Sequence, residues 1–274
     1  MTFETIQLTL NHGVALVELN RPRKMNAIHR LMWDEIRLAF RQLSKTKEAR
    51  VAVLCGTGPH FCAGIDIAML ANGARLGENG EQETCPGRLR EELRLSVLDL
   101  QDVVNTIERC TKPVLAALHG VCYGAAIDIA TACDMRYASE DARISVKEID
   151  LGLTADVGVL QRLPRVIGEG MARELAYTAR EFSGREAREI GLVNRCFGTR
   201  EELLEGVTKI ARTMADKSPL ALRGCKEMFR YTRDHSVADA LNYIATWNAA
   251  MLISDDWKEA MEAFQQKRQP KFRD

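Results

Sequence analysis

The sequence predicts an α/β protein with a β/α core and a helical C-terminal part. Short apolar segments typical of strands crowd the first half of the chain, and apolar residues at helical spacing prevail beyond Pro164. The elements do not alternate regularly, which disfavours a doubly wound sheet. With 274 residues, 46% of them hydrophobic, the chain can bury one large core, with or without an appended helical piece.

The core is expected to begin with a β-hairpin. Residues 6–10 and 14–19 are apolar or alternating on either side of a turn at 11–13. Pro22 ends the second strand in a basic turn, and apolar residues between 31 and 43 recur at helical spacing. Further strands are expected at 51–55, 113–118, 135–138 and 144–146, and a long helix at about 89–110.

The later part of the chain is expected to be helical. Residues 72–90 are polar and glycine-rich, which predicts a loop or frayed helix over the mouth of a pocket. We expect a catalytic core of residues 1–200 and a helical region of residues 201–274. The predicted helices are 157–163, 169–178, 184–190, 201–216, 220–233, 237–251 and 255–266.

The composition excludes several classes of protein. Lysine plus arginine and aspartate plus glutamate both number 38, and this zero net charge disfavours a nucleic-acid binder that works through bulk charge. The eight cysteines form no CxxC pair, which indicates reduced thiols of an intracellular protein. The histidines are not spaced like the ligands of a metal site. The sequence contains no run of about 18 apolar residues that could span a membrane.

The two ends of the chain bear on its location. Residues 1–4 lack the apolar region of a secretory signal and the arginines of a presequence. Residues 271–274 do not end in a peroxisomal tripeptide. We therefore expect a soluble intracellular protein, of the mitochondrial matrix or of a bacterial cytoplasm.

Three carboxylates stand out between residues 124 and 164. Asp128 lies inside an apolar run, Glu148 closes a strand-like segment, and Asp156 precedes a predicted helix. A buried charge is costly unless it is paired, hydrogen-bonded or functional. If the three converge, the site can take a proton at one point and return it at another. Each also has a structural alternative: an N-cap for Asp156, a solvated strand end for Glu148, and an ion pair with an arginine for Asp128.

Two loops share one design. A short apolar strand runs into a glycine-containing turn and a helix start at residues 51–65, and again at 113–126. Such turns let a ligand approach the backbone, and free N–H groups at a helix start favour negative charge. Two donors aimed at one point would make an oxyanion hole, although strand–loop–helix joins are common. The patterns GxxxxGK[ST], GxGxxG and GxSxG are absent, which disfavours phosphate-binding and hydrolase loops.

These loops resemble the signature segments of the crotonase superfamily, the enoyl-CoA hydratase/isomerase family. The first segment is Phe61-Cys62-Ala63-Gly64-Ile65-Asp66-Ile67. The second contains Lys112-Pro113-Val114, His119-Gly120 and Gly124-Ala125-Ala126-Ile127-Asp128. Further matches run from Leu19-Asn20-Arg21-Pro22 to Lys267-Arg268-Gln269-Pro270, so the resemblance covers essentially the whole chain.

The resemblance implies a spiral of ββα units, C-terminal helices used for trimerisation, and acyl-CoA substrates. The backbone N–H groups of Ile65 and Ala125 would hold the thioester oxygen; the family usually has glycine at the second position. The implied substrate contacts are Ala63, Gly64, Ile65, Asp66, Ile67 and Ala125. Arg23, Lys24, Phe264 and Lys267 match the family's coenzyme A contacts only loosely, and each has a plain surface or packing role as its alternative.

The acidic set resembles the dienoyl-CoA isomerase branch of the family. Hydratases carry glutamate at the positions of Asp128 and Glu148 and typically glycine at that of Asp156. The three acids imply a 1,5-proton shift from 3,5-dienoyl-CoA to 2,4-dienoyl-CoA. Glu148 would remove the C2 proton and Asp156 would protonate C6, with the reverse assignment open, while Asp128 would orient or tune the pair. No metal or redox cofactor is implied.

Two other functions stay open. An enoyl-CoA hydratase that activates water through Glu148 and Asp128 would leave Asp156 unexplained. A non-catalytic or RNA-binding member is disfavoured by the zero net charge and the intact acidic set. The expected partners are an acyl-CoA thioester and copies of the chain, in a homotrimer or a dimer of trimers, with no nucleic acid and no membrane. The sequence does not give the length of the acyl chain that the substrate carries, because the pocket wall is expected to include the variable loop at residues 68–90.

Overall fold

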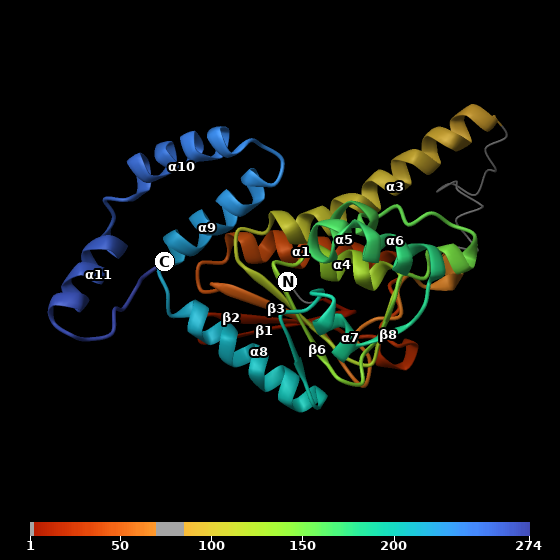
Figure 1. Ribbon diagram of the computed structural model, residues 1–274, viewed down its shortest axis with the longest axis horizontal. Coiled ribbons are helices and arrows are strands. Elements are labelled where there is room, and N and C mark those ends of the chain that lie inside the picture. Colours follow the sequence, from red (N-terminus) through yellow and green to blue (C-terminus); the bar gives the residue numbers. More distant parts are fainter. Residues whose placement is uncertain (1–2, 70–84) are drawn as a thin grey trace.

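The computed structural model describes residues 3–69 and 85–274, and within these residues its centre is a six-stranded sheet (Figure 1). The strand order is β1-β2-β3-β4-β6-β9. The β1–β2 pair is antiparallel and the later pairs are parallel, which confirms the expected hairpin. The strands are β1 (Ile6–Asn11), β2 (Val14–Leu19), β3 (Val51–Gly56), β4 (Val114–Leu118), β6 (Met135–Ser139) and β9 (Arg195–Phe197).

A smaller sheet stands beside the first and contains β5 (Val121–Tyr123), β7 (Arg143–Ser145) and β8 (Phe182–Ser183). β5 pairs in parallel with β7. The sequence predicts only a turn at 119–124, and for β5 this prediction is wrong. Three residues are too few to display an alternating pattern, so pairing with β7 decides the conformation.

Helices cover both faces of the large sheet (Figure 1). The side chain of Leu54 packs toward α1, α3 and α4, whereas that of Val53 packs toward α8. A strand that is buried on both faces needs an uninterrupted apolar run, which explains the sequence of β3. These helices are α1 (Arg30–Lys45), α3 (Pro86–Arg109), α4 (Ala125–Ala132) and α8 (Arg200–Ala215).

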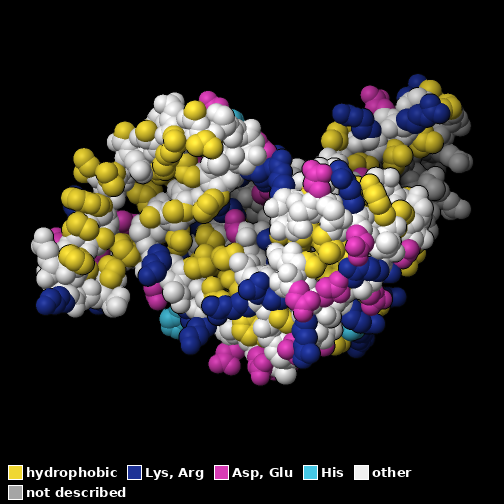
Figure 2. All heavy atoms as spheres, viewed as in Figure 1, with side chains coloured by type: hydrophobic (Ala, Val, Ile, Leu, Met, Phe, Trp, Pro, Cys, Tyr) yellow, Lys and Arg dark blue, Asp and Glu magenta, His cyan; other side chains and the backbone are white. Residues whose placement is uncertain are grey.

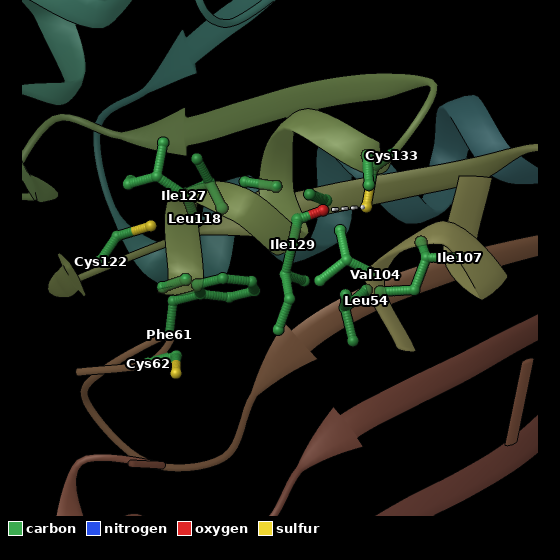
Figure 3. Packing of buried hydrophobic residues seen from close by; sticks show 14 of the residues in the cluster. Leu54, Phe61, Cys62, Val104, Ile107, Leu118, Cys122, Ile127, Ile129 and Cys133 are labelled. Atoms are coloured by element: carbon green, nitrogen blue, oxygen red, sulfur yellow. Dashed lines mark hydrogen bonds between the residues drawn. The ribbon is translucent and has the colours of Figure 1, made fainter. Parts of the chain in front are cut away.

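The helix α4 is buried along its whole length. Figure 3 shows its residues Ile127 and Ile129 among Phe61, Leu118 and Val104, in the cluster that joins α4 to the sheet. The thiol of Cys133 donates a hydrogen bond to the carbonyl of Ile129 at 3.4 Å. Packing on several sides therefore fixes the rotation of α4 about its axis. It also fixes the direction of Asp128, the residue between the two isoleucines.

Two helix boundaries differ from expectation. The prediction for residues 72–90 is a loop or a frayed helix. α3 begins at Pro86, so residues 86–90 are helical and only the loop alternative is wrong there. Residues 72–84 lie outside the described part of the chain. α5 (Val159–Ile167) starts later than predicted and continues through Pro164. The proline removes one intrahelical donor, and contacts with α4 and α6 support the helix.

The remaining helices confirm the predicted helical second half. α6 (Glu169–Thr178) and α10 (Val237–Met251) match the expected bounds. α10 begins after Ser236, whose side chain caps the helix by accepting from the amide of Asp239. The others are α7 (Gly184–Glu189), α9 (Pro219–Thr232) and α11 (Asp255–Gln265), with short 3-10 helices η1 (Pro22–Lys24) and η2 (Glu148–Leu151).

The helices α10 and α11 extend away from the core as a C-terminal arm (Figure 1). Hydrophobic side chains gather on its visible surface (Figure 2). The exposed hydrophobic residues of the arm include Val237, Leu241, Ile253 and Phe264. The division expected between residues 200 and 201 falls within α8, which packs on the sheet. The division into two domains stays a prediction.

Ile129→Ala should lower the free energy of unfolding by about 3 kcal/mol, because it leaves a cavity under α4. The residue is fully buried. Urea unfolding measures the change, and Ile67→Ala, at a position that is 71% exposed, is the matched control with an expected effect within about 0.5 kcal/mol. Equal effects of the two substitutions would contradict this account of the core.

Candidate active site

The two glycine-containing loops meet at one point. Cys62 and Cys122 form a parallel bridge, in which the amide of Cys62 donates to the carbonyl of Val121 at 3.0 Å. The amide of Tyr123 donates to the carbonyl of Cys62 at 3.1 Å. This pairing extends from the ends of two strands into the loops themselves, so the loops have a defined register.

Gly64 is a position of close approach between the first loop and the start of α4. Its φ of +88° lies in the left-handed region that favours glycine. A Cβ at this position would lie 2.7 Å from the carbonyl oxygen of Tyr123 and 3.4 Å from the nitrogen of Ala125. Only a residue without a side chain lets the first loop lie flat against the start of α4.

The amides of Ile65 and Ala125 flank this contact. Ile28 pairs with the backbone on both sides of Ile65: its amide donates to Gly64 and its carbonyl accepts from Asp66. Ala125 is the first residue of α4, whose N-cap is Gly124. Within residues 3–69 and 85–274, no protein acceptor meets either amide. The arrangement is compatible with the predicted oxyanion hole, which stays a prediction.

The segment 63–67 has structural partners as well. The amide of Ala63 donates to the carbonyl of Met25 at 2.9 Å. The carboxylate of Asp66 pairs with Arg21 at 3.1 Å and accepts from the amide of Ala68 at 3.2 Å. The protein itself thus uses part of the hydrogen-bonding capacity of the Asp66 carboxylate. The side chain of Ile67 is exposed.

Asn26 is a supporting residue that the candidate set lacks. Its buried side chain donates to the carbonyls of Thr57 at 3.0 Å and His60 at 2.8 Å, and accepts from the amide of Arg21 at 2.8 Å. It thereby ties the basic turn to the first loop. Asn26 could have been identified from the sequence, because an asparagine in a turn often stabilises the loop through hydrogen bonds to the nearby backbone.

Asp128 is 1% exposed and accepts a hydrogen bond from the amide of Val159, at the start of α5, at 2.6 Å. Desolvation, followed by the charge of Glu148, raises the pKa of Asp128 to about 7. The positive charge of Arg162 opposes this rise in pKa. Among the described residues, no lysine or arginine forms an ion pair with Asp128. The alternative that Asp128 is paired with an arginine is therefore wrong.

Glu148 lies beside the start of α4. Its Oε1 would be 3.0 Å from a Cβ placed on Gly124, the residue before Ala125. Its Oε2 is buried and has no hydrogen-bond partner within the part of the chain described. Desolvation and then the charge of Asp156 raise the pKa of Glu148. A buried carboxylate oxygen without a partner is unusual and marks a functional position. This burial contradicts the alternative that Glu148 is a solvated residue at the end of a strand.

Asp156 lies in the loop before α5. The N-cap of α5 is Gly158, and no side chain caps it, so the N-cap alternative is wrong. The backbone carbonyl of Asp156 accepts from the side chain of Gln101 at 2.7 Å, which ties this loop to α3. Although its side chain is exposed, local desolvation raises the pKa of Asp156. Its charge acts on both Asp128 and Glu148. The three carboxylates therefore lie close enough for their charges to influence one another.

A cleft of about 590 Å³ opens beside Asp156, between α3, α5 and α9. Asn105, Arg162 and Arg233 are among the residues that line it. Glu148 and the amides of Ile65 and Ala125 do not line it. Asp156 thus lines the cleft, and its charge also acts on Glu148, which lies beside Gly124.

The candidate coenzyme A residues fall into two groups. Arg23 and Lys24 belong to η1, and the charge of Lys24 acts on Asp66 in the first loop. Phe264, 81% exposed, and Lys267 belong to α11 and the turn after it, on the C-terminal arm that projects from the core (Figure 1). The single chain does not bring these groups together, and their role stays a prediction.

No cluster of His, Cys, Asp and Glu in the described part of the chain could hold a metal ion. No helix among the described residues is long and apolar enough to cross a membrane.

Comparison with known proteins identifies relatives over the full chain. Residues 9–274 match the enoyl-CoA hydratase/isomerase family profile. The peroxisomal Δ3,5-Δ2,4-dienoyl-CoA isomerase of Arabidopsis thaliana is 45% identical, over 99% of this chain and 96% of that protein. The mitochondrial protein of the same name from Homo sapiens is 42% identical, over 96% and 79%. An enoyl-CoA hydratase structure from Bacillus anthracis superimposes with a TM-score of 0.88 and 29% identity, over 98% and 99%.

Asp128→Asn should change how stability depends on pH. The pKa of Asp128 rises from 3.8 to about 7 on folding, so its contribution to stability is complete at low pH and is lost as the pH rises through about 7. Asparagine keeps an acceptor for Val159 but cannot ionise. Relative to the native chain, the variant should therefore gain up to about 4 kcal/mol between acidic and neutral pH. Urea unfolding at a series of pH values measures this gain.

The control for this prediction is Asp150→Asn, which removes an exposed carboxylate on the nearby η2. Its effect on the free energy of unfolding should change little across the same pH range. A difference between Asp128→Asn and the native chain that is independent of pH would contradict the assignment of a raised pKa to Asp128.

Proposed function

The chain belongs to the enoyl-CoA hydratase/isomerase family, and we propose from this that it is a Δ3,5-Δ2,4-dienoyl-CoA isomerase acting in the β-oxidation of fatty acids. Relatives with that name at 45% and 42% identity support the activity. The convergence of Asp128, Glu148 and Asp156 beside two unpartnered backbone amides is the observation that carries the proposal. The crotonase-like α/β fold expected from the sequence is confirmed by the structural neighbour.

The reaction begins with loss of the C2 proton of a 3,5-dienoyl thioester. Removal of this proton gives a dienolate whose negative charge reaches the thioester oxygen. The amides of Ile65 and Ala125 stabilise that oxygen most strongly as the charge develops, which lowers the barrier. The proximity of Glu148 to Gly124 supports the assignment of Glu148 to C2.

The reaction ends with protonation at C6, which gives the conjugated 2,4-diene. C2 and C6 are too far apart for one rigid carboxylate to serve both comfortably. Asp156, which lines the cleft and whose charge acts on Glu148, supplies the second acid. The C2 and C6 roles of Glu148 and Asp156 can be exchanged without changing the scheme.

The electrostatics supply the protonation states that this scheme needs. One carboxyl must be charged to take a proton while the other is protonated to give one. Because the charge of Asp156 raises the pKa of Glu148, ionisation of one carboxyl disfavours ionisation of the other. Asp128 adds a third negative charge to the group and positions the start of α5. No metal or redox cofactor enters the scheme.

The exposed apolar surface of the C-terminal arm supports a homo-oligomer, and we propose a trimer or a dimer of trimers. Val237, Leu241, Ile253 and Phe264 would leave water on assembly. The relatives named above are peroxisomal and mitochondrial. The proposed location of this chain is an intracellular compartment that oxidises fatty acids, a mitochondrial matrix or a bacterial cytoplasm.

The deciding experiment is an absorbance assay with a medium-chain 3,5-dienoyl-CoA, which follows formation of the conjugated 2,4-dienoyl product. A 2-enoyl-CoA assay run in parallel measures hydration. We expect fast isomerisation and little hydration. Fast hydration without isomerisation would instead favour the enoyl-CoA hydratase function, in which Asp156 has no role.

Glu148→Gln and Asp156→Asn should each lower kcat for the diene by at least about a hundredfold, because each removes a proton-transfer group. Binding of a saturated acyl-CoA, measured by calorimetry, should persist, since the backbone amides remain. Asp150→Asn serves as a carboxylate control with near-native kcat. A near-native kcat in either test variant would remove that residue from the mechanism.

A further inference from the structure

Arg162 lies on α5, in the wall of the cleft beside Asp156, and its side chain is only 13% exposed. Its Nη2 donates to Oδ1 of Asn105 at 2.6 Å and to Oε2 of Glu108 at 3.0 Å, both on α3. A guanidinium with two directed partners is held in one orientation. The side chain therefore fastens α5 to α3 at a defined place.

The guanidinium also packs on the backbone of the loop that carries Asp156. A Cβ built on Gly158 would collide with Nη1 of Arg162, so the guanidinium occupies the space beside this glycine. Gly158, at a φ of +128°, is the N-cap of α5 and lies two residues after Asp156. Together with the hydrogen bond from Gln101 to the carbonyl of Asp156, this contact braces the loop from two sides.

Arg162 also acts on the buried carboxylate. Its positive charge opposes the effects of Glu148 on η2 and of Asp156 in the loop, which are the other charged groups that face Asp128. The helix α3, which packs against α4, directs Glu108 toward Arg162. The charge of Asp128 in turn holds the amide of Val159, one residue after Gly158.

We propose that Arg162 is a positioning residue of the isomerisation, which braces the Asp156 loop through its contact with Gly158 and its hydrogen bonds to α3. This inference rests on the proposed function. It assigns Arg162 no contact with the substrate. Its effect passes through Asp156 and Asp128.

The first test is Arg162→Gln, with kcat, KM and the pH dependence of kcat measured for the 3,5-dienoyl-CoA. A loop displaced by a fraction of an ångström should lower kcat by up to about a hundredfold, while KM changes little because the thioester-binding amides lie elsewhere. Without the positive charge the pKa of Asp128 rises further, so the acidic limb of the profile should move to higher pH.

The matched control is Arg165→Gln. Arg165 lies one turn further along α5 and lines the same cleft, but it pairs with Asp234 at 3.1 Å and is half exposed. Its replacement should leave kcat and the pH profile unchanged. Arg162→Lys should keep the position of the acidic limb while recovering only part of kcat, because lysine restores the charge without the planar, two-partner geometry. Indistinguishable behaviour of Arg162→Gln and Arg165→Gln would overturn the proposal.

Two further measurements keep the test decisive. If Arg162→Gln does not fold, Asn105→Ala removes the 2.6 Å hydrogen bond to Arg162. The fold decrease in kcat should then exceed the fold increase in KM, and an unchanged kcat counts against the proposal.

Titration of 13C-labelled aspartate carboxyls by NMR, assigned with Asp128→Asn, should show a higher pKa for Asp128 in Arg162→Gln. This readout does not depend on activity. An unshifted titration rejects the inference even if the chain does not isomerise the diene, whereas lack of turnover by the native chain rejects the proposed function.

Discussion

The parallel pairing of Cys62 with Cys122 is the constraint on which the rest of the site depends. It joins the loops that follow two neighbouring strands and sets their register. Gly64 then rests against Tyr123 and the start of α4, and the amides of Ile65 and Ala125 come to flank one point. The side chain of Asn26 supports the pairing through four hydrogen bonds with the backbone. Backbone donors held by a sheet-like pairing need no rearrangement when charge develops on a bound oxygen.

A second constraint is electrostatic. Three carboxylates interact in a small volume, and one of them, Asp128, is almost fully buried. Such a cluster opposes folding, because each charge is desolvated in the presence of the others. The amide of Val159 and the charge of Arg162 offset part of this cost. The core beneath α4, with Ile127 and Ile129 closely packed, supplies the stability that a strained acidic site requires.

Much of the fold was predictable from periodicity, because local signals and tertiary packing agree there. The apolar run of β3 and the spacing within α6 and α10 are examples. β5 was not predictable, since its conformation depends on a partner strand some twenty residues away. The carboxylates could be named from the sequence, but their convergence could not be derived without the family resemblance. Arg162 and Gln101 were missed because their roles depend on how α3 and α5 pack, which the spacing within either helix does not reveal.

The sulfur atoms at the pairing of the two loops have a consequence for reactivity. The thiols of Cys62 and Cys122 are fully buried, and burial raises the pKa of Cys62 to about 12 and that of Cys122 well above its ordinary value. Thiolates are the species that oxidants and alkylating reagents attack, and these two thiols form almost none at neutral pH. Cys225 on α9 is exposed to solvent. An electrophile will therefore modify Cys225 before either of these thiols, and a fluorescent maleimide can label the chain on α9 while the pairing of the two loops stays intact.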